Sequence, residues 1–378
     1  MIKNYLLTPG PTPVPPNVLL EMARPIIHHR TPQFQKILQE TEEGLKYVFQ
    51  TKNDVLILTS SGTGGMEGAV CNLLSPGDKA ICVQGGKFGE RWTELCQANG
   101  IEPVIIDVKW GSAVEPKEIE RVLAASKAKA VFVTLCETST GVTTDIKAIA
   151  EITKKTDAVL AVDAISGLGA VECKMDDWGL DVVVSGSQKG LMIPPGLAFV
   201  SLSPKAWKLV EQSKCPKYYF DFKEAKKAIA KTDTPFTPAI TLVIGLNEAL
   251  KQIKQETLEA IMARHKKMAK AIREASKALG LALFSQTASS DAVTAVNLPA
   301  GIDGEKLVKV MRDEYGVGIA GGQAELKGKV FRIASMGYMT QFDIIVAISC
   351  LELVLNKMGY KFQLGAGVAA AQKVFLEA

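Results

Sequence analysis

Residues 182–196 read VVVSGSQKGLMIPPG, an apolar run followed by a small polar turn that contains Lys189 and by a loop with two prolines. The run is typical of a strand that is buried on both faces of a parallel sheet. Such a strand places the amine of Lys189 at the carboxyl edge of the sheet, where open α/β sheets bind ligands. A lone loop lysine is more often an ordinary surface residue, so its role depends on what the neighbouring strands carry.

Strand-like and helix-like segments alternate around this stretch. The strand-like runs are VLILTS (55–60), KAICVQ (79–84), PVIIDV (103–108), KAVFVT (129–134), AVLAVD (158–163), DVVVSG (181–186) and LAFVSLS (197–203). Helical patterns lie between them, among them Glu90 to Asn99, Pro116 to Ser126, and Asp145 to Lys155 with Asp145 as its cap. This alternation predicts βαβ units and a mostly parallel, seven-stranded sheet.

The pattern changes after residue 255, where a long charged amphipathic helix is expected from Leu258 to Leu279. Further strands are expected at 292–297 and 330–333, and further helices at 303–315, 341–358 and in the tail after Gly365. We therefore predict an α/β protein with an extended, proline-rich arm (1–17), a large domain (18–254) and a small α+β domain (255–378).

Composition narrows the classes of function. The chain has 378 residues, 47% of them apolar and 22% charged, and a net charge of +4, which is typical of a soluble globular protein and not of a nucleic-acid binder. Its seven cysteines form no CxxC pair and its histidines are only His28, His29 and His265, which argues against a zinc or iron–sulfur site. With no membrane-length apolar stretch and no signal peptide in view, we expect a cytoplasmic protein with reduced thiols.

A glycine-rich turn follows the first strand, in SSGTGG (60–65). It sets Ser61, Gly62 and Thr63 at the start of a helix, where backbone amides favour a phosphate group, although a tight connection would look similar. The glycine spacing does not match the dinucleotide pattern, and the next strand ends in Gln84 and not in an acid. Both points disfavour a nicotinamide cofactor.

Other polar or aromatic side chains follow successive strands. Asp163 ends a strand 26 residues before Lys189, where it could cap a turn or face the pyridine nitrogen of pyridoxal phosphate, which needs a nearby carboxylate to act as an electron sink. Phe88 could pack in the core or stack on a cofactor ring. The hydroxyls of residues 138–140 could satisfy turn amides or meet a cofactor. Their common position at strand ends favours a pyridoxal-phosphate site around Lys189.

At this point the chain resembles the class V aminotransferases, in particular the alanine–glyoxylate, serine–glyoxylate and serine–pyruvate group. The matching stretches are TPGPTPVP, SSGTGGMEGA, GGKFGERW, ETSTGV, VDAISGLGA, SGSQKGLMIPPG, TPFTPAITL and VFRIASMG. The resemblance covers nearly the whole chain. It implies the aspartate-aminotransferase-like fold of pyridoxal-phosphate enzymes (fold type I) and a homodimer.

The resemblance also implies roles for individual residues. Lys189 would bind the cofactor as a Schiff base and then act as the base, with Asp163 at the pyridine nitrogen. Phe88 would stack on the ring and Thr138 would lie by its oxygen substituent. The phosphate end would be lined by Ser61, Gly62, Thr63, Ser187 and Gln188, and by Thr237 of the neighbouring subunit. On the substrate side the candidates are Arg332, which would hold the α-carboxylate, and the arm residues Gly10 and Pro11.

The implied activity is transfer of an amino group from alanine or serine to glyoxylate or pyruvate, with ping-pong kinetics. Alanine–glyoxylate enzymes commonly carry histidine at the position of Thr63 and tryptophan at that of Phe88, so aspartate and 2-aminoethylphosphonate remain alternative donors. Desulfurases carry a histidine directly before the lysine, where this chain has Gln188, and Cys350 lies in an apolar helical pattern; a desulfurase-like lyase is therefore disfavoured. A different class of alternative is an accessory subunit of a redox complex.

Overall fold

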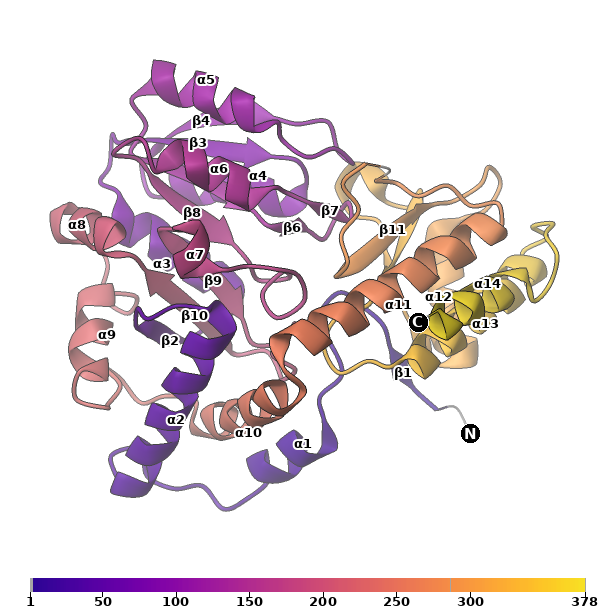
Figure 1. Cartoon of the computed structure of the whole chain (residues 1–378), viewed down its shortest axis with the longest axis horizontal. Coiled ribbons are helices and arrows are strands. Elements are labelled where there is room, and N and C mark those ends of the chain that lie inside the picture. Colours follow the sequence, from indigo (N-terminus) through magenta and orange to yellow (C-terminus); the bar gives the residue numbers. More distant parts are fainter. Residues whose placement is uncertain (1–2, 286, 378) are drawn as a thin grey trace.

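The computed structural model describes residues 3–285 and 287–377. Figure 1 shows two lobes, with the large sheet in one and the carboxyl-terminal elements in the other, joined by the long helix α11. The sheet of the large lobe has the order β2-β10-β9-β8-β5-β3-β4. Only β10 runs antiparallel to its neighbours, so the predicted mostly parallel, seven-stranded sheet is confirmed.

The strands of this sheet coincide with the seven apolar runs. They are β2 (Val55–Thr59), β3 (Lys79–Gln84), β4 (Glu102–Asp107), β5 (Ala130–Thr134), β8 (Val159–Asp163), β9 (Val182–Gly186) and β10 (Leu197–Leu202). All residues of the central strands β5, β8, β9 and β10 are buried, as their continuous apolar sequences require. The register pairs Asp163 with Thr134 on one side and with Val184 on the other, so the carboxyl ends of β5, β8 and β9 lie together.

Helices cover both faces of the sheet. One face carries α2 (Pro32–Phe49), α5 (Pro116–Ser126), α6 (Ile146–Thr153), the short α7 (Met175–Trp178) and α10 (Ile240–Glu256). The other carries α3 (Gly62–Leu73), α4 (Lys87–Ala98), α8 (Pro204–Gln212) and α9 (Phe222–Ile229). Asp145 caps α6 as predicted, since its Oδ1 accepts from the Ala148 amide at 3.0 Å. Helix α4 begins at Lys87, three residues before the predicted Glu90.

The small lobe is α+β. Its antiparallel sheet has the order β11-β14-β13, from β11 (Val293–Asn297), β14 (Val330–Ala334) and β13 (Ala320–Gly321). It packs with α11 (Leu258–Ala278), α12 (Gly304–Tyr315), α13 (Gln341–Lys357) and α14 (Ala366–Leu376). The expected tail helix is therefore present. The domain boundaries at 17 and 254 stay predictions, although α10 ends and α11 begins close to the second one.

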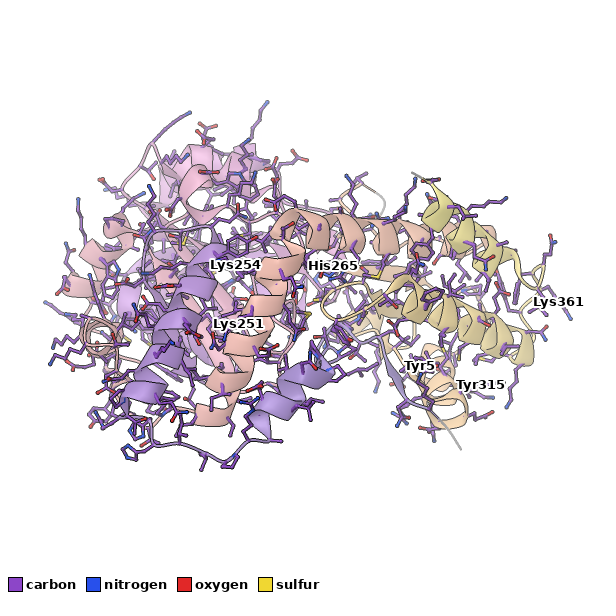
Figure 2. All side chains as sticks on the ribbon, turned by 60° about the horizontal axis from the view of Figure 1, so that its bottom comes forward. Tyr5, Lys251, Lys254, His265, Tyr315 and Lys361 are labelled. Carbon is purple, nitrogen blue, oxygen red and sulfur yellow. The ribbon has the colours of Figure 1, made fainter. Side chains whose placement is uncertain are left out.

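The amino-terminal arm is extended only as far as residue 15. The prediction of an extended arm to residue 17 was wrong for its last two residues, which begin α1 (Pro16–Met22), because proline fits the first position of a helix. Within it β1 (Tyr5–Leu6) pairs in parallel with β12 (Val317–Gly318) of the small lobe, and Figure 2 shows Tyr5 beside Tyr315 there. The arm then crosses to the large lobe, where the Thr12 amide donates to the Gln188 carbonyl at 3.1 Å. Residues 1 and 2 of the predicted arm lie outside the described part.

His265 connects the two lobes. It lies on α11 where this helix leaves the large lobe (Figure 2), and its side chain is fully buried. Its Nε2 accepts from the Gly337 amide of the small lobe at 3.1 Å, and its Nδ1 lies 3.4 Å from the Ala170 carbonyl of the large lobe. Burial lowers the pKa of His265 to about 4, so the ring stays neutral and able to accept this bond.

No helix of the described residues is long and apolar enough to cross a membrane.

Candidate active site

Lys189 lies in the turn after β9, at the carboxyl edge of the sheet, and its side chain is buried. Its Nζ donates to the Pro9 carbonyl of the arm. Burial lowers the pKa of Lys189 to about 8, and the nearby Asp163 charge opposes this shift. Near neutral pH the amine is therefore much closer to its reactive, unprotonated form than an exposed lysine is.

The arm closes over this amine at Gly10. Its φ of +135° lies in the region that favours glycine, and a Cβ atom at this position would overlap the Lys189 amine. The Thr12 hydroxyl donates to the Lys189 carbonyl at 2.9 Å and so fixes the arm to the lysine turn. Gly10 and the adjoining Pro11 thus border the site, where the resemblance places them.

Asp163 is the last residue of β8 and is 3% exposed. Its Oδ1 accepts from the Ile165 amide at 2.8 Å. Burial raises the pKa of Asp163 to about 7, while the positive charges of Arg91 and Lys189 act in the opposite direction. Because a carboxylate is costly to bury with so few partners, this one is poised to gain stability from a cationic ligand.

The glycine-rich turn forms the start of α3. Ser61 is the N-cap residue, and its side chain makes no capping hydrogen bond. A Cβ atom on Gly62 would overlap the Ile165 side chain, and one on Gly64 would overlap the Ser60 hydroxyl. Glycine lets this backbone lie close to the Ile165 and Ser60 side chains, and the first amides of a twelve-residue helix are available to an anion.

Three further residues were predicted at the phosphate end. The Gln188 Oε1 is buried without a hydrogen-bond partner among the described residues, as expected for a side chain that awaits a ligand. Thr63 is half-buried on the first turn of α3. The Ser187 hydroxyl is already engaged, because it donates to the Pro194 carbonyl at 2.8 Å and accepts from the Leu197 amide at 3.2 Å. Its predicted role toward phosphate stays a prediction.

Phe88 is the second residue of α4 and is half-buried. The guanidinium of Arg91, one turn further along the helix, lies over the Phe88 ring at 4.9 Å from its centroid. One face of the ring is therefore covered by a cation, and the stacking of Phe88 on a cofactor ring stays a prediction. Sequence reasoning missed Arg91, because an arginine near the start of an amphipathic helix looks like a solvent-facing residue.

Arg332 lies on β14, in the small lobe, and is 5% exposed. Its Nη1 donates to the Thr138 carbonyl at 2.7 Å and its Nε to the Gly321 carbonyl at 2.9 Å. Burial lowers the pKa of Arg332 to about 10. Its Nη2 makes no hydrogen bond with the described residues and can donate to a carboxylate. The Thr138 hydroxyl lies 3.5 Å from that of Ser166.

Thr237 makes no hydrogen bond to the other predicted site residues within the described part of the chain. It is exposed and lines a small hollow with Thr59, Tyr219 and Phe236.

All seven cysteines are free and buried, Cys350 among them on α13, so none projects on a mobile loop as a desulfurase would require.

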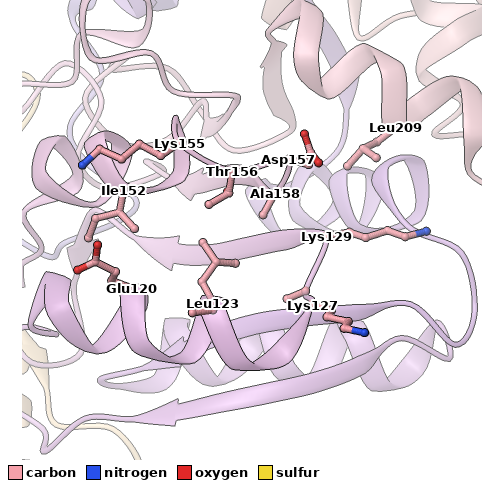
Figure 3. A pocket seen from close by; sticks show the side chains of 12 residues that line it. Glu120, Leu123, Lys127, Lys129, Ile152, Lys155, Thr156, Asp157, Ala158 and Leu209 are labelled. Carbon is pink, nitrogen blue, oxygen red and sulfur yellow. The ribbon is translucent and has the colours of Figure 1, made fainter.

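The large grooves of the surface lie elsewhere. Figure 3 shows one of about 510 Å³ that is lined by Lys127, Lys129 and Asp157, among others. These residues precede β5 and β8, so the groove lies at the amino edge of the sheet, away from Lys189. Its lining includes the apolar residues Leu123, Ile152 and Leu209, and no residue of the predicted site lines it.

The fold is α/β, and its candidate site holds a buried lysine at the carboxyl edge of a mostly parallel sheet. The chain belongs to the class V aminotransferases, since the family model described as "Aminotransferase class-V" matches residues 4–344. The predicted family is therefore confirmed.

Relatives of known name match over almost the full length of the chain. A protein named "Soluble hydrogenase, small subunit" from Synechococcus sp. (strain PCC 6716) is 46% identical over 98% of this chain and 98% of its own. The L-aspartate–glyoxylate aminotransferase of Paracoccus denitrificans is 38% identical, over 98% of this chain and 96% of its own. The serine–glyoxylate aminotransferase of Methylorubrum extorquens is 35% identical, over 99% and 96%.

A solved structure shows the same fold. The ureidoglycine–glyoxylate aminotransferase of Bacillus subtilis superposes with a TM-score of 0.94 at 30% identity, covering 100% of this chain and 99% of that one. The protein thus has the predicted aspartate-aminotransferase-like fold, fold type I, and is an aminotransferase. Class V membership implies pyridoxal phosphate as the cofactor. The residues fit it, because an orphaned Gln188 oxygen, a glycine cradle at α3 and a buried carboxylate meet beside Lys189.

Proposed function

We propose that this protein binds pyridoxal phosphate through Lys189 and moves an amino group from a small amino acid, alanine or serine, to glyoxylate or pyruvate. One observation carries the proposal: Lys189, Asp163 and Arg332 are all buried at the same end of the sheet, and burial shifts the pKa of each toward its neutral form. Such clustered shifts are a mark of catalytic sites. The names of several relatives support glyoxylate as the acceptor.

When bound, pyridoxal phosphate supplies an aldehyde carbon that reacts with amines and a cationic ring that withdraws electrons from the substrate. Asp163 would hold the ring nitrogen protonated. Lys189 would release the cofactor to the amino substrate and then, with a pKa near 8, take the proton from the substrate Cα as a general base. The phosphate would rest on the amides at the start of α3, with Gln188 beside it.

Arg332 would orient the substrate. Its two bonds to carbonyl groups fix the guanidinium plane before any ligand arrives, so little side-chain entropy is lost when the substrate carboxylate binds. A carboxylate held by Nη2 would fix the position of Cα relative to the Lys189 amine. Amino acids that lack an α-carboxylate would then be poor donors.

The experiment that tests the cofactor assignment uses Lys189→Ala. The wild-type protein should gain the visible absorbance of a lysine-bound cofactor when pyridoxal phosphate is added, and the variant should not. A panel of amino donors against glyoxylate and pyruvate would then identify the substrates, and initial rates at several concentrations of both should give the parallel lines of ping-pong kinetics. Unchanged absorbance and turnover in Lys189→Ala would contradict the proposal.

We also propose a homodimer whose subunits share their sites, in which Thr237 contacts the cofactor phosphate of the neighbouring subunit. An exposed aromatic cluster beside it supports this: Tyr218 is 80% exposed and Tyr219 46%, and the Tyr219 ring stacks on Phe236 at 5.2 Å. Exposed aromatic patches of this kind are typical of interfaces.

We propose a cytoplasmic location for the protein, which the seven free cysteines support, because thiols stay reduced in that compartment.

Mixed dimers test the shared site. Lys189→Ala and Thr237→Glu should each be inactive as pure proteins, the second because its carboxylate repels the phosphate. After the two are mixed and allowed to exchange subunits, a hybrid dimer has one doubly altered site and one intact site. About a quarter of the wild-type activity should return, whereas no recovery in verified hybrids would show that Thr237 serves its own subunit.

Aspartate is the second candidate donor, and Arg91 is the observation that favours it. Its guanidinium makes no hydrogen bond or ion pair with the described residues, yet its charge acts on both Asp163 and Lys189. A second free cation near the site could hold a second carboxylate. If aspartate is the donor, Arg91→Gln should raise the KM for aspartate by about tenfold, as expected for the loss of one charged contact, without raising that for serine. Equal effects on both donors would argue against this role.

An accessory role in a redox complex, the alternative that the name of the cyanobacterial relative would support, is separable by experiment. Purified chain that binds pyridoxal phosphate and transfers amino groups alone needs no partner complex. Protein that is purified without bound pyridoxal phosphate and transfers no amino group would favour the accessory role.

A further inference from the structure

Glu137 carries a buried carboxylate that the proposed mechanism does not use. It ends the short strand β6 (Cys136–Glu137) and is only 4% exposed. Its Oε2 accepts from the backbone amides of Phe88 at 3.1 Å and Gly89 at 2.9 Å. Its Oε1 accepts from the Ser139 amide at 3.1 Å and the Ser139 hydroxyl at 2.5 Å. Four donors surround one carboxylate.

Two of these donors belong to the first turn of α4, where backbone amides have no partner inside the helix. The N-cap position is Gly86, which has no side chain to offer, and a Cβ atom there would overlap Glu137 and Ser139. A carboxylate from another strand therefore caps the helix. This is possible because β3, which precedes α4, lies beside β5, which precedes Glu137.

The same turn holds the substrate side of the site. The carbonyl of Thr138, the next residue, accepts from Arg332 Nη1 at 2.7 Å. The Ser139 hydroxyl, which donates to Glu137, also accepts from the Lys87 amide at 3.1 Å. Residues 137–139 thus connect the helix that carries Phe88 with the arginine of the small lobe.

Electrostatics agree with this arrangement. Burial raises the pKa of Glu137, but all four donated bonds favour the ionised form. Its negative charge in turn raises the pKa of Asp163 and of Arg332. Glutamine has the same shape but no charge, so at this position it would not raise the pKa of Asp163 or of Arg332. It also has one acceptor oxygen where glutamate has two.

We propose that Glu137 is a positioning residue, which sets the placement of Phe88 relative to Arg332 and so aligns the cofactor ring with the substrate carboxylate. The inference rests on the proposed function, because both aligned groups act on ligands of that function. The four hydrogen bonds of Glu137 all come from protein groups.

The matched control is Glu352 in the small lobe. It is 2% exposed, and it likewise caps a helix, since it accepts from the Gly365 amide at 2.5 Å and the Val368 amide at 2.9 Å at the start of α14. Glu137→Gln and Glu352→Gln therefore remove the same kind of carboxylate from the same kind of helix cap. They differ in whether the capped helix carries a site residue, and Glu137 also accepts two bonds from Ser139 that have no counterpart at Glu352.

The experiment compares the two variants in the full-length protein. Glu137→Gln should weaken pyridoxal phosphate binding by about tenfold and raise the donor KM by about tenfold, the expected cost of losing a charged hydrogen bond at each aligned group. It should also reduce the circular dichroism of the bound cofactor, because the ring is no longer held in one orientation. Glu352→Gln should leave all three unchanged within about twofold, although both variants lose stability.

Hydrogen exchange of the cofactor-free protein gives a readout that is independent of activity. Exchange at the Phe88 and Gly89 amides should speed up in Glu137→Gln and not in Glu352→Gln. If Glu137→Gln does not fold, Ser139→Ala removes one donor of the same carboxylate and should show smaller changes in the same direction. Wild-type protein that binds no pyridoxal phosphate would overturn the proposed function, whereas normal cofactor affinity, dichroism and KM in Glu137→Gln would overturn only this inference.

Discussion

Asp163 and Asp181 lie at opposite edges of the same sheet and are both buried, yet the protein surrounds them differently. Asp163, at the carboxyl end of β8, accepts one backbone hydrogen bond, and burial raises its pKa to about 7. Asp181 directly precedes β9 at the amino edge. It accepts from the Leu160 amide at 3.0 Å and the Ser203 hydroxyl at 2.8 Å, and it pairs with Lys205 at 3.5 Å.

The difference shows at which edge of the sheet the protein keeps a destabilising buried charge, and this is the edge where a ligand is expected to bind. A buried charge with too few partners destabilises the native state, and it persists where a ligand completes its surroundings. Lys189 shows the same incomplete environment as Asp163, since its pKa is lowered by burial. At the amino edge, by contrast, the Asp181 carboxylate has its partners within the protein. The nearby groove in Figure 3 is lined by charged side chains and by the apolar side chains of Leu123, Ile152 and Leu209.

Asp163→Asn is the strongest test of the difference between the two edges. The amide oxygen can keep the bond from Ile165, but it cannot hold a pyridine nitrogen in its cationic form. Activity should fall by about a thousandfold, which corresponds to about 4 kcal/mol of transition-state stabilisation. Steady-state kinetics with saturating pyridoxal phosphate measures the loss, and nearly normal turnover would remove Asp163 from the mechanism.

The same variant should stabilise the cofactor-free protein. With a pKa near 7 in the folded chain and near 3.8 when unfolded, the folded state binds the Asp163 proton more tightly. The stability of the wild type therefore falls as pH rises from about 4 to 7, by up to about 4 kcal/mol from this residue. Denaturant unfolding across this range should show that Asp163→Asn lacks this part of the fall and is more stable at pH 8. Parallel curves would contradict the shift.

Arg332→Lys is expected to have the next largest effect. A lysine keeps the charge but offers no planar pair of donors, and it cannot bond the Thr138 and Gly321 carbonyls while holding a carboxylate. The kcat/KM for the amino donor should fall by about a hundredfold, mostly through KM, whereas cofactor affinity changes little. A fall in kcat alone would instead place Arg332 in the chemical step.

The sequence predicts much of this edge because local patterns encode it. Each central strand is a continuous apolar run, so the positions of Lys189 and Asp163 at strand ends follow directly. The two-residue strands, such as β1 and β12, carry no periodicity, and their pairing depends on contacts between distant segments.

The roles of residues that act through tertiary contacts could not be predicted from local sequence patterns. Glu137 stands beside hydroxyl residues in a polar turn and reads as a solvent-facing acid, since its burial depends on β3 and β5 being neighbours in the sheet. The early start of α4 has the same origin, because the cap that stabilises it comes from Glu137 and not from the preceding loop. An acid directly before the predicted Thr138 was the only signal available.

Asp181→Asn tests the other side of the comparison and should have the smallest effect on catalysis. The amide leaves Lys205 without its ion pair and places an amino group where the Leu160 amide or the Ser203 hydroxyl now donates. The free energy of unfolding should fall by about 1–3 kcal/mol, the usual cost of an unsatisfied buried polar group. Donor KM, kcat and cofactor affinity should stay within about twofold of the wild type, because Asp181 lies at the edge opposite Lys189. If cofactor affinity fell as strongly as stability, the two edges would be coupled, and the satisfied charges of the amino edge would have to be counted as part of the site.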